Sequence, residues 1–305
     1  MSPASIVVTG SVNVDFILRV GALPRPNETI HGHDMAVAIG GKGLNQAVAC
    51  ARLGTPTAMI AAIGDDNFGV QANAYLSAND VDTAKVSALG GVATGVANIF
   101  VADDGQNMIV VTPGANGRLT PSMVDAAETT IASAKAMIVQ LETPLETVRR
   151  ALEVARRHGV LTVLNPAPVD MAAKALFPLA DLVTPNETEL ARLTGIDGQD
   201  DASLTRALQA LVVAGAKQAL VTLGSQGCAA LIDGQLQRVP AFTVKAVDAT
   251  GAGDHFNGAL VTRLVAGDDL LAAMRYASAA SALSVTRPSA DSAPTAADVA
   301  AFLKS

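Results

Sequence analysis

The sequence contains no tryptophan, only 3% aromatic residues and no basic stripe, and its formal net charge is −7. Nucleic-acid-binding proteins usually combine a basic surface with aromatic side chains that stack on bases. A nucleic-acid partner is therefore not expected. Cysteine is also scarce: Cys50 and Cys228 are far apart in apolar surroundings, which is typical of small core residues in a reducing compartment.

Long hydrophobic runs are missing as well. No stretch of about 18 uninterrupted apolar residues is available to span a membrane, and residues 1–11 have neither the basic region nor the apolar length of a secretory signal. We therefore expect a cytoplasmic protein without a membrane partner. Half of the residues are hydrophobic and no low-complexity linker interrupts them, so we expect one domain over residues 1–305.

Short β-branched segments alternate with segments of helical period along most of the chain. Predicted strands occupy residues 5–10, 57–64, 136–141, 161–166, 181–186 and 218–224. Predicted helices occupy residues 45–54, 145–159, 187–195 and 204–215, and three more follow residue 254. This alternation predicts an α/β fold, a doubly wound and mostly parallel sheet with helices on both faces.

Two segments, residues 12–20 and 94–114, do not follow this alternation. The second contains the turn pair Asp104-Gly105, which predicts a β-hairpin. Both arms of the hairpin are apolar at nearly every position, so we expect a small second sheet that covers a ligand, another subunit or both. An extra hairpin packed on the main core is the alternative.

Common nucleotide and metal motifs are missing. Neither G-x-x-x-x-G-K-[ST] nor a G-x-G-x-x-G after the first strand is present, which disfavours a P-loop enzyme and a Rossmann dehydrogenase. His31 and His33 have no third ligand nearby in the sequence, so we interpret them as a solvated pair on a connecting segment.

The stretch DATGAGDHFNGAL (248–260) carries the most specific chemistry. Gly251, Ala252 and Gly253 can turn sharply and direct successive N–H groups at one point, with the positive end of a helix behind them. Such a nest would stabilise the charge of a transferring phosphoryl group. Asp254 is the first side chain able to reach that point as a general base; the alternative is a helix cap.

Polar residues also follow two predicted strands. Asn13 and Asp15 come after the first strand, and Glu142 follows the predicted strand at 136–141, where open α/β sheets bind ligands. The segment IGGKGLNQ adds Gly40, Gly41, Lys42, Gly43 and Asn45. Fixed donors and acceptors of this kind suit a polyol. Taken singly, these residues can also be a turn pair, a flexible loop and helix N-terminal charge.

The segment TPNETEL begins another predicted helix. Asn186 and Glu189 have the spacing of a capping box. A carboxylate and an amide at this position can also hold water on Mg²⁺ beside nucleotide phosphates. The two interpretations are compatible.

Seven motifs occur in order from about residue 5 to residue 303: SVNVD, AIGGKGLNQA, QLETP, NPAP, TPNETE, TLGSQG and DATGAGDHFNGA. Together they resemble the ribokinase-like (PfkB) carbohydrate kinases, although the last motif alone specifies only the wider family. The resemblance implies a doubly wound α/β domain, a small β lid formed by residues 12–34 and 94–112, and a homodimer through that lid.

The resemblance also implies a reaction, the ATP-dependent phosphorylation of D-ribose at its 5-hydroxyl. Asp254 would be the base, and the N–H groups of Gly251, Ala252 and Gly253 would form an anion hole. The residues expected at the sugar are Asn13, Asp15, Gly41, Lys42, Asn45, Glu142 and Asp254. Those expected at ATP are Asn186, Thr222, Gly224, Gly227, Gly253 and Ser278.

Two metal ions are implied in the same way. Glu189 would organise hydrated Mg²⁺ or another divalent cation. A K⁺ ion near the anion hole would be bound mainly through carbonyl groups, by Asp248, Thr250, Ser284, Arg287 and Ser289.

The family commonly has threonine after the catalytic aspartate, where this chain has His255. We expect this side chain to face outward on the first helical turn; the alternative is a group near the phosphates that titrates at about pH 6 to 7.

Other functions remain open at this point: a kinase of another sugar (deoxyribose, a ketose or a sugar acid), a nucleoside kinase, or a non-catalytic sugar or nucleotide sensor. A nucleoside kinase would need aromatic side chains over the base, and the lid segments offer only Phe16 and Phe100. A sensor would be expected to lose the base or the glycine nest, and this chain retains both.

Overall fold

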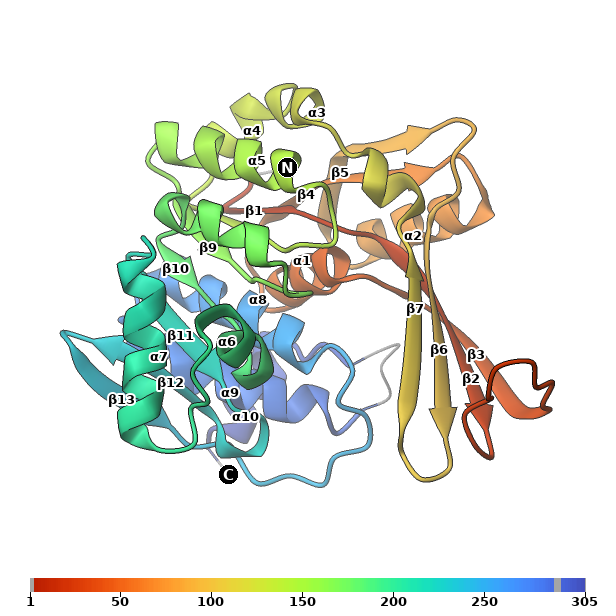
Figure 1. Cartoon of the computed structure of the whole chain (residues 1–305). Coiled ribbons are helices and arrows are strands. Elements are labelled where there is room, and N and C mark those ends of the chain that lie inside the picture. Colours follow the sequence, from red (N-terminus) through yellow and green to blue (C-terminus); the bar gives the residue numbers. More distant parts are fainter. Residues whose placement is uncertain (1–2, 288–291, 305) are drawn as a thin grey trace.

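The computed structural model describes residues 3–287 and 292–304 (Figure 1). Its larger sheet has nine strands in the order β13-β12-β11-β10-β9-β8-β1-β4-β5. Strands β11, β10, β9, β8, β1, β4 and β5 run parallel to one another, whereas β12 and β13 are antiparallel additions at one edge. The bounds are β1 (Ile6–Thr9), β4 (Thr57–Gly64), β5 (Val81–Leu89), β8 (Ala136–Val139), β9 (Leu161–Leu164), β10 (Leu182–Val183), β11 (Gln218–Thr222), β12 (Cys228–Ile232) and β13 (Gln235–Val239).

Helices cover both faces of this sheet. Side chains alternate along β1, so that Val7 joins one buried cluster while Ile6 and Val8 join the other. The first cluster is covered by α3 (Pro121–Asp125), α4 (Glu128–Ser133), α5 (Leu145–Arg157), α6 (Glu187–Thr194) and α7 (Asp201–Val213). The second is covered by α1 (Lys42–Arg52), α2 (Asn67–Ala78), α8 (Ala252–Ala266), α9 (Leu270–Ser284) and α10 (Ala296–Phe302). The predicted doubly wound fold is confirmed.

None of the helices in the described ranges is sufficiently long and apolar to cross a lipid bilayer.

All the predicted strands and helices are present, but other strands and helices were missed: β3, β5, β12, β13, α2, α3 and α4. The β12–β13 hairpin could have been found, because its turn is the pair Asp233-Gly234, and both residues adopt a positive φ (50° and 77°). Strand β5 is a half-exposed edge strand with polar residues on both faces, so its hydrophobic pattern is weak.

A second sheet of four strands begins directly after β1. It has the order β3-β2-β6-β7 and consists of β2 (Asn13–Val20), β3 (Gly32–Gly40), β6 (Gly95–Ala102) and β7 (Asn107–Thr112). The hairpin predicted around Asp104-Gly105 is confirmed as the antiparallel pair β6–β7. In Figure 1 this small sheet extends away from the helices, at the lower right.

The order of the strands locates the site. Strand β1 lies between β4 and β8, so the chain continues from the centre of the sheet first to one side and then to the other. Open α/β sheets bind ligands beyond the carboxyl ends of the strands where the order reverses in this way. The small sheet joins the large one at that edge, because β2 starts four residues after the end of β1.

Candidate active site

Glu142 ties together three segments at the carboxyl edge of the sheet. Its Oε2 atom accepts hydrogen bonds from Ser11 Oγ at 2.5 Å and from the backbone N–H of Lys42 at 3.1 Å. Glu142 follows β8, Ser11 follows β1, and Lys42 is the first residue of α1. Residues of the predicted polyol cluster from distant parts of the sequence are thus brought into contact.

The start of α1 approaches the loop after β1 so closely that glycine is required. Gly41 has a φ of +97°, and a Cβ at this position would lie 2.8 Å from the backbone N of Asn13. A Cβ at Gly43 would lie 2.5 Å from the backbone N of Ser11. The GGKG segment is therefore held against the loop rather than being flexible.

The side chain of Asn13 is buried, with 3% of its surface exposed. Its Oδ1 atom accepts a hydrogen bond from Asn116 Nδ2 at 2.7 Å, and Asn116 Oδ1 accepts one from the N–H of Val12 at 2.8 Å. Asn116 was missed by sequence reasoning, because it lies in a short 3-10 turn that carries no pattern of its own.

Asp15 lies on β2 in an environment that disfavours its charge. Burial, followed by the negative charges of Glu142 and Asp254, raises its pKa from 3.8 to about 6. A Cβ at Gly40, on the neighbouring strand β3, would lie 2.4 Å from Asp15 Oδ2 and overlap it, so only glycine leaves room for this carboxyl group. Three carboxyl groups thus converge at one place, as a ligand rich in hydroxyl groups requires.

Asp254 lies in the first turn of α8 and is buried, with 6% of its surface exposed. The helix cap is Gly251, in the left-handed conformation (φ 74°), and Asp254 is the third helical residue. Its side chain accepts hydrogen bonds from Gln46 Nε2 (2.9 Å to Oδ1) and Asn45 Nδ2 (3.3 Å to Oδ2). The alternative interpretation of Asp254 as a helix cap is therefore wrong.

Lys42 lies among the acidic groups of this region. The charge of Asp254 is the largest influence that raises its pKa, and Glu142 and Glu189 add to it, whereas burial acts in the opposite direction. Burial also raises the pKa of Glu189. Because these groups influence one another, Glu189 at the start of α6 and Glu142 after β8 belong to the same charged region as Asp254.

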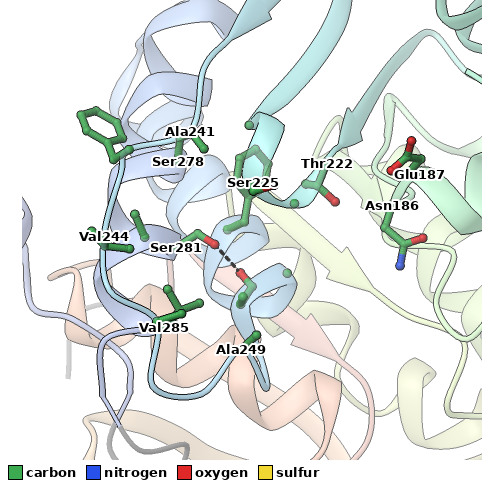
Figure 2. Close-up of a pocket in the computed structure, with 18 of the residues that line it drawn as sticks. Asn186, Glu187, Thr222, Ser225, Ala241, Val244, Ala249, Ser278, Ser281 and Val285 are labelled. Carbon is green, nitrogen blue, oxygen red and sulfur yellow. Dashed lines mark hydrogen bonds between the residues drawn. The ribbon is translucent and has the colours of Figure 1, made fainter. Parts of the chain in front are cut away.

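A cavity of about 720 Å³ opens beside the start of α8. Figure 2 shows Asn186 and Thr222 on one side of it, and Val244, Ser278 and Val285 on the other. All six residues expected at ATP line this cavity: Asn186, Thr222, Gly224, Gly227, Gly253 and Ser278. Sequence reasoning missed its apolar lining, which includes Ala241, Phe242, Val244, Ala246 and Phe256.

The two parts of the site meet at the first turn of α8. Gly253 lines the cavity, and the next residue, Asp254, is hydrogen-bonded to α1 and influences the pKa values of Asp15 and Lys42. Helix α9 also contacts this turn, because Ser281 Oγ donates a hydrogen bond to the carbonyl of Ala252 at 3.0 Å (Figure 2).

The model of the pfkB family of carbohydrate kinases matches residues 3–296. The protein belongs to this family. It is 38% identical to a ribokinase of Haemophilus influenzae over 301 residues, covering 98% of both chains, and 37% identical to a deoxyribokinase of Salmonella typhi over 285 residues, covering 92% of both. The structure of Arabidopsis thaliana ribokinase complexed with ribose and ATP superposes with a TM-score of 0.93, at 31% identity and over 100% of both chains.

His255 differs from its expected position in this carbohydrate kinase. The ring does not face outward: it is buried, with 5% of its surface exposed, and lies beside Gly251. Burial, aided by the positive charge of Arg52, lowers its pKa to about 4. A pKa of about 4 also contradicts the alternative of a group that titrates at pH 6 to 7, because the packing of α8 against α1 buries the imidazole.

The residues expected around K⁺ are held together by the backbone. The N–H groups of Val247 and Asp248 donate to the carbonyl of Val285, next to Ser284 at the end of α9, and Asp248 Oδ1 accepts from the N–H of Thr250 at 2.8 Å. The Arg287 side chain pairs instead with Asp298 at 3.2 Å, so only its carbonyl is available for an ion. Ser289 lies outside the described residues.

The donor set does not build a cage for a divalent metal. Within residues 3–287 and 292–304, no group of three or more histidine, cysteine, aspartate or glutamate side chains is arranged to hold one. Asn186 and Glu189 form the predicted capping box, in which each side chain accepts from the backbone N–H of the other at 2.8–2.9 Å. His33 pairs with the exposed side chain of Asp103, with its Nε2 atom 3.2 Å from Asp103 Oδ1. This arrangement fits Mg²⁺ that is carried by phosphates and water.

Proposed function

We propose that the protein transfers the γ-phosphoryl group of ATP to the 5-hydroxyl of D-ribose. The ribokinase relatives and the Arabidopsis complex with ribose and ATP support this substrate pair. The observation that carries the proposal is the position of Asp254, between a cavity lined by the six expected ATP residues and the cluster of polyol-binding side chains.

The sugar is held by two kinds of group. Hydroxyl groups donate to the carboxylates of Asp15 and Glu142, and their oxygens accept from Asn45 and Lys42. Asn13 and Gly41 complete this part of the site. Asp254 takes the proton of the 5-hydroxyl as that oxygen bonds to the γ-phosphorus, while the bond from phosphorus to the bridging oxygen of ADP breaks.

The negative charge on the transferred phosphoryl group is stabilised at the start of α8. The N–H groups of Gly251, Ala252 and Gly253 point along the positive end of the helix, and the Lys42 ammonium adds a full positive charge. The N–H of Ala252 also contacts the carbonyl of Ala249, at 3.2 Å, so Gly251 and Gly253 are the freer donors.

Two ions belong to this proposal. Mg²⁺ would be held through water by Glu189 and would neutralise charge on the nucleotide phosphates. K⁺ would be held by Asp248, Thr250, Ser284, Arg287 and Ser289. Its role is tested by comparing turnover in K⁺ with turnover in Na⁺ at equal ionic strength.

We also propose a homodimer through the small sheet, which would act as a lid. Its outer strands expose large apolar side chains, with 44–60% of each surface accessible: Met35, Val37, Met108, Ile109, Val110 and Val111. Monomeric proteins rarely leave such a patch uncovered.

The experiment is a substrate panel. ADP release is followed with ATP and D-ribose, 2-deoxy-D-ribose, ketoses, sugar acids and nucleosides, and the site of phosphorylation is read from NMR of the product. The relationship to a deoxyribokinase makes the ribose to deoxyribose ratio of kcat/KM the deciding number. A site that hydrogen-bonds the 2-hydroxyl rejects the analogue without it. A kcat/KM that is higher for another acceptor than for D-ribose would refute the proposal.

A further inference from the structure

A chain of buried amide side chains lies behind Asp254. Gln46 is the residue next to Asn45 on α1, and its side chain is completely buried. Its Nε2 atom donates to Asp254 Oδ1 at 2.9 Å and to Asn165 Oδ1 at 3.2 Å, and its Oε1 atom accepts from Gln140 Nε2 at 2.6 Å. Both ends of this amide are therefore engaged.

The direction of these hydrogen bonds is set by the carboxylate. An ionised carboxylate only accepts, so Gln46 must present its NH₂ group to Asp254 and its oxygen to Gln140. Gln140 must then donate, and its own Oε1 atom is left buried without a partner among the described residues. Asn165 is oriented in the same sense, because its Nδ2 atom donates to the carbonyl of Thr184 at 2.9 Å.

An unpartnered buried carbonyl is unfavourable, and a core retains one only where the rest of the arrangement compensates. Here the compensating interaction is the hydrogen bond that Gln46 donates to the Asp254 carboxylate. Among the described residues, the second carboxylate oxygen, Oδ2, has only the longer contact with Asn45 at 3.3 Å. The two oxygens of Asp254 are thus unequal.

We propose that Gln46 is a positioning residue, which holds Oδ1 of Asp254 so that Oδ2 is the oxygen that takes the proton of the acceptor hydroxyl. Gln140 keeps the Gln46 amide in the required orientation. The inference rests on the proposed function, and it assigns a task to two residues outside the expected substrate sites.

The test compares Gln46→Met with the wild-type enzyme. Methionine has nearly the length of glutamine but no donor, so Asp254 loses its fixed partner. We expect kcat to fall roughly 10- to 100-fold, the cost of a small misplacement of a reacting group, while the KM values for sugar and ATP change less than about twofold. The acidic limb of the kcat profile should move to higher pH, since a carboxylate that loses a donor ionises less readily.

Gln46→Glu distinguishes a donor from mere packing. A glutamic acid can donate to Oδ1 only while it is protonated, so this variant should retain more turnover than Gln46→Met at low pH and should acquire a new alkaline limb. The other charged groups near Asp254, which are Asp15, Lys42, Glu142 and Glu189, are the same in all these proteins.

Thr147→Val is the matched control, because it removes a buried hydrogen bond of 2.7 Å, to the carbonyl of Leu119, away from the site. It should lower the melting temperature without changing kcat or the acidic limb. Titration of ¹³C-labelled aspartate carboxyl groups, with Asp254→Asn for assignment, gives a readout that needs no turnover.

The results separate the two proposals. If the wild-type protein phosphorylates no sugar, the proposed function fails, and the carboxyl titration still decides whether Gln46 controls Asp254. If the wild-type protein is active, but Gln46→Met leaves both kcat and the Asp254 titration unchanged, the inference about Gln46 is overturned.

Discussion

Replacing Asp15 by asparagine should stabilise the sugar-free protein at alkaline pH. The structure raises the pKa of this carboxyl group from 3.8 to about 6, first through burial and then through the charges of Glu142 and Asp254. The folded protein therefore binds the proton more tightly than the unfolded chain does. The wild-type protein must ionise Asp15 in an unfavourable place above pH 6, and the asparagine variant avoids this cost.

The magnitude follows from linkage. A difference of about 2 pH units, at 1.36 kcal/mol per unit, corresponds to about 3 kcal/mol. Below pH 3.8 the group is protonated in both states and costs nothing; the penalty grows as the pH rises and is complete above the folded pKa. Between pH 4.5 and pH 8 the stability advantage of the variant should grow by about 2 kcal/mol.

Urea unfolding followed by circular dichroism measures this difference, since the chain has no tryptophan for fluorescence. Asp34→Asn, an exposed position on the same small sheet, is the control and should show no such growth. Asp15→Asn should also raise the KM for the sugar far more than the KM for ATP. An advantage that is equal at pH 4.5 and pH 8, or equal effects on both KM values, would refute this account of Asp15.

Three further variants test other parts of the structure. Asp254→Asn should leave sugar binding nearly intact and reduce kcat by roughly 10²–10⁴-fold, as loss of a general base does; near wild-type turnover would remove Asp254 from this role. Gly43→Ala should lower the melting temperature strongly, because its Cβ would overlap the backbone of the loop after β1; an unchanged melting temperature would contradict the close approach. Ile109→Glu combined with Val110→Glu places a charge on each face of β7 and should give a monomer by light scattering, whereas the exposed control Val213→Glu should remain a dimer. A monomeric wild-type protein would refute the lid dimer.

Local patterns were sufficient for most of the fold. The alternation of β-branched and helical segments predicted the mostly parallel sheet, because buried strands and amphipathic helices have different hydrophobic periods. The turn pair Asp104-Gly105 predicted the β6–β7 hairpin, and the spacing of Asn186 and Glu189 predicted a capping box, since both features depend only on neighbours in the chain.

The candidate site could be predicted where its residues lie in short motifs at the ends of strands. The motifs identified the residues that now line the cavity and those that converge on Asp254, but not what each one touches. His255 illustrates the limit: its position on the first turn of α8 suggested an exposed ring, whereas the packing of α1 against α8 buries it and lowers its pKa.

By itself, the sequence determined the class of fold, the family and the residue types of the site, because these depend on periodicity and on motifs that are contiguous in the chain. Only the tertiary structure decided that Gln46 contacts Asp254 and Gln140, that Asn116 contacts Asn13, and that burial raises the pKa of Asp15 to about 6. Hydrogen bonds between residues about 100 to 200 positions apart, and the free energy of burying a charge, exist only once the chain has brought those groups together.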